Sequence, residues 1–268
     1  MRFASVIHQG RPFAVKIDGE HAVPLTDISE LGRSTPASLL AAPPLYDKVT
    51  FPVSELTYRP VVPNPSKVLC VGLNYLAHIQ ETQNKEHDYP VLFPKFASSL
   101  TGAFQDVPRP PESREVDYEG ELAVVIGKLT RHFKPDDDWR QVVRGFTLAN
   151  DISARDLQKK DAQWTRAKGF DTFCPVGPIV SDEIDFDSGV TIETRLNGEL
   201  RQQASTRDFI FSLPHLLSFI TAAFTLEPGD IILTGTPSGV GPLSSGDLVE
   251  VSVAGLGVLR NPVESSAE

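Results

Sequence analysis

The sequence predicts an α+β fold in which β-sheets pack face to face. Short runs that favour strands recur along the chain, and they do not alternate with helices as βαβ units would. Apolar residues make up 40% of the 268 residues and charged residues 22%, which is enough apolar material for a sizeable core. The 22 prolines, about 8% of the chain against a usual ~5%, indicate many turns between short elements.

The first 60 residues are expected to form a small β-rich domain. Residues 2–25 favour short strands, with Asp18-Gly19 as a hairpin turn. A short helix is expected over "TPASLLAA", residues 35–42. A linker and a domain boundary are expected near residue 60, where closely spaced prolines restrict the backbone and remove hydrogen-bond donors: Pro60, Pro63 and Pro65.

The second region, residues 61–268, is expected to be the larger, catalytic domain, and it begins with a buried strand over "KVLCVG". The polar stretch that follows predicts a lid over about residues 74–95. Leu76 and Ile79 are its candidate core anchors, and so few anchors predict a segment that is only marginally ordered without a ligand.

The remaining elements follow from local patterns. A short helix with acids in its first turn is expected over "DDDWRQVVRGF", and an apolar strand over "FTLAN", ending at Asp151. Ser153 and Asp156 have capping-box spacing, which predicts a helix starting just after Asp151. Strands are expected in "DIILTGTPSGVGP", leading into a Gly-rich loop, and in "DLVEVSVAGLGVLRNPV". Helical spacing predicts a helix with these apolar positions: Leu213, Leu216, Leu217, Ile220, Ala223 and Phe224.

Charge and composition narrow the class of protein. The formal net charge of −10 argues against nonspecific binding to nucleic acid or to an anionic membrane. The two cysteines, Cys70 and Cys174, are interpreted as buried thiols, which favours a reducing compartment. No apolar run approaches the ~18 residues of a membrane span, so a cytoplasmic protein is expected.

Two acids in "VDYEGELAVVIGK" suggest a metal site. Glu119 and Glu121 are two residues apart on a predicted strand, so their side chains point the same way. At about 6 Å and an effective dielectric of 20, they would repel by about 3 kcal/mol. A divalent cation would remove this repulsion. The alternative is a solvated strand end with two unrelated surface acids.

A third acid favours the metal hypothesis. Asp151 also ends an apolar strand, and three carboxylates from neighbouring strands would form half of an octahedral shell. Oxygen-only ligands point to Mg²⁺ or Mn²⁺, with Ca²⁺ possible, rather than to zinc.

Other polar residues suit chemistry beside such a site. Lys168 lies among aromatic residues, where a lysine donates to an oxyanion or acts as a base. His78 and Glu81 would share one side of a helix on the lid, as a general base and its carboxylate partner would. The loop "GTPSGVG" could line a pocket with backbone N–H groups and the Thr236 hydroxyl. For each of these the alternative is structural: solvated side chains, or simple loop geometry.

Several motifs in order resemble the fumarylacetoacetate hydrolase family. They are "VGLNYLAHIQE", "PVLFPKFASSLTG", "VDYEGELAVVIGK", "GFTLANDISARDLQ", "WTRAKGFDTFCPVGP" and "LEPGDIILTGTPSGVGP", within residues 68–242. The resemblance implies a mixed β-sandwich roll and a homodimer. It implies a metal site of Glu119, Glu121 and Asp151, with Lys168 and the lid dyad of His78 and Glu81 as catalytic residues. Contacts to the substrate are implied for Arg155, Gln158 and Thr236; no role is assigned to Tyr75, Lys95 or Phe170.

The expected function follows from this site. We expect a metal-dependent enzyme that hydrolyses a C–C bond of an acylpyruvate-type 2-oxo acid through an enolate. The same site would also suit an oxaloacetate decarboxylase or a 2-hydroxyhepta-2,4-diene-1,7-dioate isomerase. A non-catalytic protein that binds a metal or metabolite is the alternative of another class.

Overall fold

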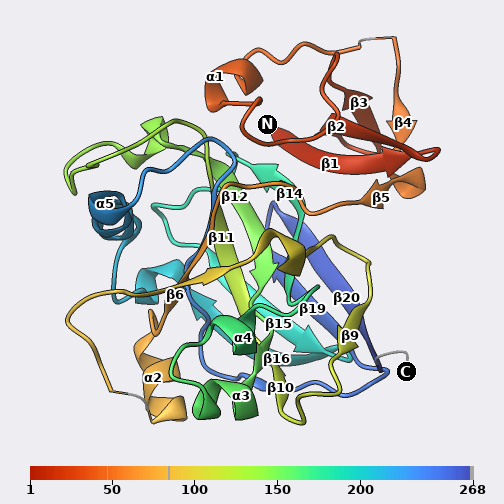
Figure 1. The fold of residues 1–268 in the computed structure, drawn as a ribbon. Helices are drawn as coiled ribbons and strands as arrows, with labels where there is room; N and C mark the ends of the chain where they lie inside the picture. The colour runs from red at the N-terminus through yellow and green to blue at the C-terminus, as the bar shows by residue number, and fades with distance from the viewer. Residues whose placement is uncertain (47, 84, 266–268) are drawn as a thin grey trace.

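The computed structural model describes residues 1–46, 48–83 and 85–265. Strands and loops dominate it, and the described helices are short, which confirms the predicted α+β class (Figure 1). None of the described helices has the length and apolar character needed to cross a membrane. The helices are α1 (Ala37–Leu40), α2 (Leu76–Thr82), α3 (Arg155–Lys160), α4 (Thr165–Lys168) and α5 (Leu213–Ala223), with 3₁₀ turns η1 (Val53–Glu55), η2 (Ala97–Ser99), η3 (Trp139–Gln141) and η4 (Thr206–Asp208).

One 12-stranded sheet runs through the molecule in the order β4-β3-β2-β1-β14-β12-β11-β17-β6-β7, with β5 beside β1 and β8 beside β14. Its strands are β1 (Arg2–His8), β2 (Arg11–Asp18), β3 (His21–Pro24), β4 (Phe51–Pro52), β5 (Thr57–Tyr58), β6 (Val68–Gly72), β7 (Val91–Lys95), β8 (Leu100–Thr101), β11 (Gly120–Ile126), β12 (Val143–Asn150), β14 (Cys174–Ser181) and β17 (Ile231–Leu233).

Two smaller sheets complete the fold. The five-stranded sheet has the order β16-β15-β19-β20-β9, and the three-stranded sheet has the order β13-β10-β18. Their strands are β9 (Val107–Arg109), β10 (Val116–Tyr118), β13 (Ser153–Ala154), β15 (Thr191–Leu196), β16 (Glu199–Ser205), β18 (Gly241–Pro242), β19 (Leu248–Val253) and β20 (Gly257–Ser265).

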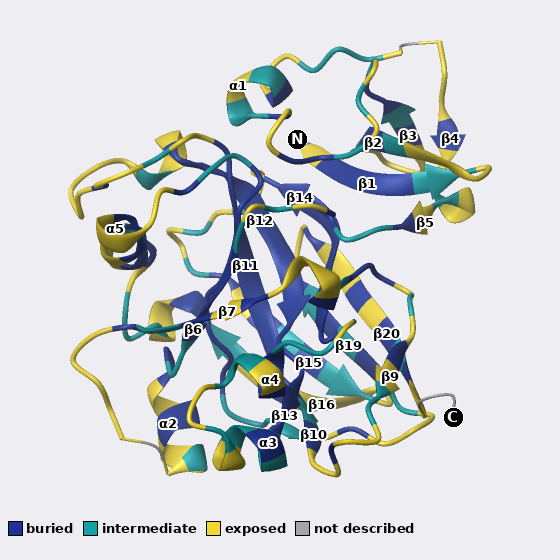
Figure 2. Ribbon diagram, in the orientation of Figure 1, coloured by how far each residue is buried: buried dark blue, intermediate teal, exposed yellow. Residues whose placement is uncertain are grey.

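The centre of the large sheet is buried on both faces. Every residue of β11, β12 and β14 is buried (Figure 2). The apolar runs of β11 and β14 fit this burial, whereas β12 also buries polar side chains, Arg144 among them. Cys70 and Cys174 are free and buried in this core, as predicted. Gly120 lets the two larger sheets approach, because a Cβ there would lie 2.0 Å from the Oγ1 of Thr194 on β15.

The N-terminal strands form a hairpin layer at one end of the large sheet (Figure 1). The predicted hairpin is present, with Gly19 and Glu20 as the two loop residues between the paired Asp18 and His21. The layer joins the rest of the sheet through β1, which pairs antiparallel with β14 over two residue pairs.

Three local predictions are wrong. The helix expected over "DDDWRQVVRGF" is only the 3₁₀ turn η3, and the residues from Val143 on belong to strand β12. The capping box at Ser153 does not form: Ser153 lies on β13, its hydroxyl donates to the carbonyl of Asp151, and α3 begins only at Arg155. Strand pairing with β10 holds this segment extended, so tertiary contacts override the local signal. Helix α5 ends at Ala223, and Phe224 is 42% exposed; Thr221 rather than the last two predicted apolar residues faces the core.

Candidate active site

Antiparallel pairing of β11 and β12 brings the three predicted acids together. Gly120 pairs with Asn150, which places Glu119 opposite Asp151, and the Asp151 N–H donates to the Glu119 carbonyl at 2.8 Å. Oxygen atoms from Glu119, Glu121 and Asp151 lie within 4.8 Å of one another, and all three residues are buried. Sequence spacing alone left the adjacency of these strands open, and the register now provides it.

This cluster fits a divalent cation. Burial, together with the charges of Asp151 and Glu119, raises the pKa of Glu121 well above its usual range. Among the described residues, the one hydrogen-bond donor to its carboxylate is the N–H of Gly235, at 2.7 Å. Buried and mutually repelling carboxylate oxygens with so few donors are ligands that a cation such as Mg²⁺ or Mn²⁺ would satisfy.

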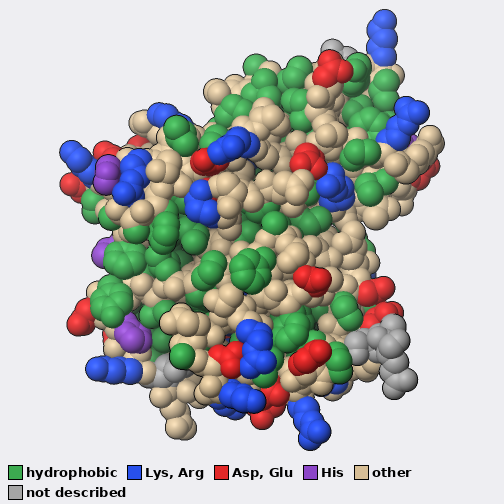
Figure 3. All heavy atoms as spheres, viewed as in Figure 1, with side chains coloured by type: hydrophobic (Ala, Val, Ile, Leu, Met, Phe, Trp, Pro, Cys, Tyr) green, Lys and Arg blue, Asp and Glu red, His purple; other side chains and the backbone are tan. Residues whose placement is uncertain are grey.

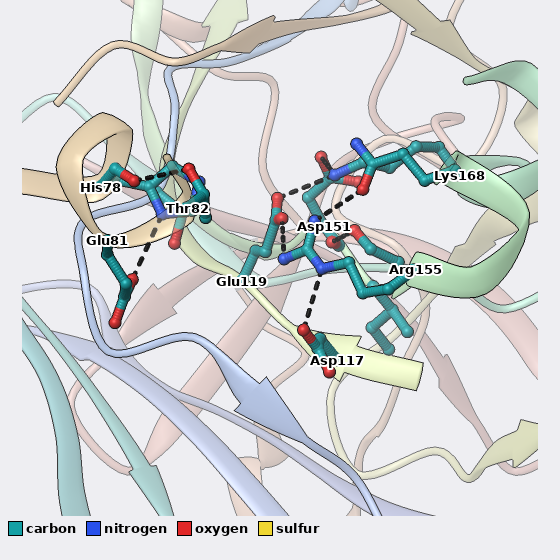
Figure 4. Close-up of polar contacts among 12 residues, drawn as sticks. His78, Glu81, Thr82, Asp117, Glu119, Asp151, Arg155 and Lys168 are labelled. Atoms are coloured by element: carbon teal, nitrogen blue, oxygen red, sulfur yellow. Dashed lines mark hydrogen bonds and ion pairs between the residues drawn. The ribbon is translucent and has the colours of Figure 1, made fainter. Parts of the chain in front are cut away.

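Two buried lysines hold the other two acids. The Lys168 ammonium donates to Glu119 and to Asp151, both at 2.8 Å (Figure 4). Burial lowers the pKa of Lys168, but the charges of Asp151 and Glu119 outweigh it and the pKa is raised, so Lys168 stays protonated and is suited to donate hydrogen bonds. The Lys95 ammonium lies 2.7 Å from Asp151 and donates to three backbone carbonyls, those of Ile152, Lys168 and Phe173.

Arg155 lies on the other side of Glu119. Its guanidinium pairs with Glu119 at 2.5 Å and with Asp117 at 2.9 Å, and it donates to the Gln158 side chain at 2.9 Å. Asp117 therefore acts on the cluster through Arg155 rather than as a member of the acid group. Lys168 and Arg155 together keep the pKa of Glu119 below its usual value although burial alone would raise it.

His78 and Glu81 come from the short helix α2, and His78 lines the same cavity as the acids. The imidazole is 5% exposed, and its Nδ1 lies 3.6 Å from the Glu81 carboxylate, which is longer than a hydrogen bond (Figure 4). Burial, followed by the charges of Arg155 and Lys168, lowers the pKa of His78, so the imidazole is neutral near pH 7 and able to accept a proton.

The anchoring of this helix differs from the prediction. Ile79 is buried as expected, but Leu76 is 48% exposed. Tyr75 takes its place: the ring is buried and packs edge-on against Phe209 at 5.1 Å between ring centres. The sequence of this short polar segment does not show which of its two adjacent apolar residues, Tyr75 or Leu76, is the buried one.

Thr236 lines the same cavity, but its hydroxyl is already engaged. It donates to the Gly120 carbonyl at 3.0 Å and accepts from the Gln202 side-chain amide at 2.8 Å. The second bond ties the Gly-rich loop to β16, so this hydroxyl supports the loop as well as facing the cavity.

Most of these groups line one cavity of about 550 Å³. Helices α3 and α4 contribute to its lining. Basic and acidic side chains gather on the surface in the region of these helices (Figure 3). Glu81 and Lys95 are not part of the cavity lining. The other nine side chains predicted or found at the site line it: His78, Asp117, Glu119, Glu121, Asp151, Arg155, Gln158, Lys168 and Thr236. The sequence reasoning assigned no role to Lys95; a lysine within the apolar stretch "VLFPKF" was its one signal.

The fold and this cavity, with a carboxylate cluster that could hold a metal ion, suit an enzyme. Comparisons with known proteins give its family. Residues 67–264 match the family model described as fumarylacetoacetate (FAA) hydrolase C-terminal. The chain belongs to the fumarylacetoacetate hydrolase family.

Relatives of this chain carry several different activities in their names. It is 42% identical to the mitochondrial oxaloacetate tautomerase Fahd2a of Rattus norvegicus over 253 residues, covering 90% of this chain and 80% of that protein. A 5-carboxymethyl-2-hydroxymuconate delta-isomerase structure from Mycobacterium smegmatis matches with a TM-score of 0.86 and 33% identity, over 99% of this chain and 100% of that one. The fumarylacetoacetate hydrolase of Exiguobacterium antarcticum gives the same TM-score, identity and coverage.

Proposed function

We propose that this protein is a metal-dependent enzyme that interconverts the enol and keto forms of a small 2-oxo dicarboxylic acid, with oxaloacetate as the first candidate. The observation that carries the proposal is a buried, neutral imidazole, that of His78, in the same cavity as the three acids and Lys168. Keto–enol exchange needs one group to take a proton from carbon and one to donate to oxygen. The names of the tautomerase and isomerase relatives support this choice.

Glu119, Glu121 and Asp151 would hold the metal ion, and Mg²⁺ or Mn²⁺ suits their oxygen ligands. When bound, such an ion supplies Lewis-acid polarisation of a carbonyl and charge for a developing enolate. Side chains of the protein would carry out the remaining steps, which are proton transfer and hydrogen bonding to the substrate.

His78 would move the proton at carbon. Its Nδ1 faces Glu81, which leaves Nε2 to take the proton from the carbon beside the keto group and to return it. A Glu81 carboxylate that shortens its 3.6 Å distance on substrate binding would fix the required tautomer. Lys168, kept protonated by its two acidic neighbours, would donate to the substrate oxygen on which charge develops.

The mouth of the cavity favours a second carboxylate on the substrate. Four cationic side chains line the cavity, and three have carboxylate partners: Arg155, Lys168 and Lys159, the last bonded to Glu115 at 2.8 Å. Within the described part of the chain, no ion pair engages the fourth, the exposed Arg114. We infer that Arg114 binds the remote carboxylate of a dicarboxylic acid.

C–C bond hydrolysis of an acylpyruvate is the second candidate. The named hydrolase from Exiguobacterium antarcticum supports it, and His78 would then activate a water molecule instead of taking a proton from carbon. Decarboxylation of oxaloacetate needs neither step, since enolate stabilisation is enough.

A substrate panel tests the proposal. Purified protein with Mg²⁺ or Mn²⁺ is assayed for enol-to-keto conversion of oxaloacetate, isomerisation of a 2-hydroxyhepta-2,4-dienedioate, hydrolysis of acetylpyruvate and fumarylpyruvate, and release of CO₂ from oxaloacetate. We expect tautomerisation to be the fastest reaction and to stop with EDTA. Faster acetylpyruvate hydrolysis would favour the second candidate. Tight metal binding with no turnover of any substrate would favour a non-catalytic binding protein.

A further inference from the structure

A second cavity lies far from the acid group, between the N-terminal layer and the central strands. It has a volume of about 350 Å³, within the range of small-ligand sites, and it shares no lining residue with the acid-lined cavity. Apolar side chains make up most of its wall: Phe3, Leu40, Val143, Phe146, Val180, Ile184 and Phe186.

Arg144 on β12 lines this cavity and has no partner. The residue is 6% exposed, and all three guanidinium nitrogens are buried without a hydrogen bond. Among the described residues it is the one arginine or lysine in this state, because the others with a buried unpartnered nitrogen have one such atom each. A buried charge without a partner is strongly unfavourable, and burial lowers the pKa of Arg144 only to about 10, so it stays charged at neutral pH.

The surrounding acids do not supply the missing partner. Asp182 pairs with the Met1 ammonium, Asp187 with Arg140, and Asp185 with the N–H and hydroxyl of Ser188. These three carboxylates lie at the cavity rim and would repel a ligand that carries several negative charges.

Close backbone packing brings helix α1 against the strand that carries Arg144. Gly127 allows α1 to approach this strand, because a Cβ on Gly127 would lie 2.7 Å from the Cβ of Ala37 and 3.1 Å from the Arg144 backbone. The Ala37 N–H then donates to the Gly127 carbonyl at 3.0 Å. Helix α1 therefore closes one side of a pre-formed site.

We propose that this cavity is a binding site for a monocarboxylate with an apolar body, whose carboxylate pairs with the Arg144 guanidinium. A planar carboxylate matches the guanidinium in a two-bond geometry, the apolar walls accept the body, and the acidic rim excludes polyanions.

Binding of benzoate to the purified protein tests this site. Titration calorimetry is expected to detect benzoate and hexanoate but neither neutral benzamide nor inorganic phosphate. Arg144→Met is expected to weaken benzoate binding by about 30-fold or more. Two controls keep wild-type affinity: Lys134→Met, which removes an exposed charge outside the cavity, and Glu121→Gln, which alters the acid-lined cavity.

Several results would overturn the proposal. Absence of benzoate binding to the wild-type protein does so directly and needs no variant. Equal binding of benzamide, preferred binding of phosphate, or loss of binding in Glu121→Gln would each contradict the assigned ligand or place. If Arg144→Met does not fold, Arg144→Lys keeps the charge but not the two-bond geometry and is expected to bind benzoate more weakly; unchanged affinity would contradict the pairing.

Discussion

Lys95 and Lys168 place two ammonium groups beside the three carboxylates of the proposed metal site. With all three acids ionised, three carboxylates and two ammonium groups leave one negative charge in excess. Arg155 and Asp117 do not alter this sum, because their charges cancel each other. A divalent ion would reverse the sign of this excess. An anionic substrate is therefore repelled by the metal-free cluster and attracted once the ion is present.

Replacing His78 tests the proton-transfer role. His78→Asn keeps a polar side chain of similar reach but removes the base, so kcat for oxaloacetate tautomerisation is expected to fall about 10²- to 10⁴-fold with KM nearly unchanged. The matched control is His87→Asn, an exposed histidine on the same predicted lid, which should act as wild type. Steady-state kinetics measures kcat. If His78→Asn has the wild-type kcat, His78 takes no part in the proton transfer.

Replacing Arg114 tests the preference for dicarboxylates. Arg114→Gln is expected to raise KM for oxaloacetate about fivefold, the effect of losing one exposed charge pair, and to leave KM for acetylpyruvate unchanged. Lys160→Gln removes a charge on α3 outside the cavity and serves as the control. An equal rise in KM for both substrates would mean that Arg114 does not read the remote carboxylate.

The residues that sequence reasoning found and those it missed differ in kind. The three acids were predictable from local patterns. Strand periodicity places the side chains of Glu119 and Glu121 on the same face, and Asp151 stands at the end of an apolar run. Lys95 was not given a role, because its three carbonyl partners come from residues 57 to 78 positions away. Arg144 gave no signal at all, since an unpaired guanidinium is visible only when its surroundings are known.

At the scale of elements, Asn74 fixes the helix that carries His78. Its buried side-chain amide donates to the Thr234 carbonyl at 2.8 Å and to the Phe211 carbonyl at 3.3 Å, and its oxygen accepts from the Phe211 N–H at 2.8 Å. Asn74 lies two residues before α2, so these bonds tie the start of the helix to the strand end after β17 and to the segment before α5. The position of His78 depends on this attachment.

Asn74→Ala is expected to reduce the free energy of unfolding by about 2–4 kcal/mol, because buried partners lose their hydrogen bonds, and to lower kcat. Chemical denaturation and steady-state kinetics measure the two effects. Asn64→Ala, which removes one exposed hydrogen bond to Glu30, should change stability by no more than about 0.5 kcal/mol. A stable Asn74→Ala variant would show that α2 is held by other contacts.

Element boundaries were harder to predict than element types. The buried strands over "KVLCVG" and "FTLAN" appear where apolar runs predicted them. The helix after Asp151 starts later than its capping signal, because β13 pairs with β10 first. Local patterns do not contain that pairing, which joins residues 116–117 to residues 153–154.

At the scale of the whole molecule, the proposed metal site lies at the centre of the fold. Glu121 lies on β11, Glu119 lies between β10 and β11, and Asp151 directly follows β12. Strand β11 belongs to the large sheet and approaches the five-stranded sheet at Gly120. Ligand binding there should stabilise the entire protein rather than one loop.

Removal of the metal should lower the melting temperature. An ion present at about 100 times its Kd stabilises by about 2.7 kcal/mol, which corresponds to about 5–10 °C for a chain of this size. Differential scanning calorimetry with EDTA, and then with excess Mg²⁺ or Mn²⁺, measures the change. Glu121→Gln is expected to lose this response and to melt above the EDTA-treated wild type, because it removes one of three repelling carboxylates. A melting temperature unaffected by EDTA would argue against the site.

The separate origins of the acids and the base have an evolutionary consequence. The carboxylates lie on or beside the central strands β11 and β12, whereas His78 and Glu81 come from one short helix attached at its start. Substitutions in that helix can change which atom is deprotonated without disturbing the ion-holding strands. Divergence within such a family can then proceed by exchanging one small segment while the sheet is conserved in shape, in keeping with relatives named for three different reactions.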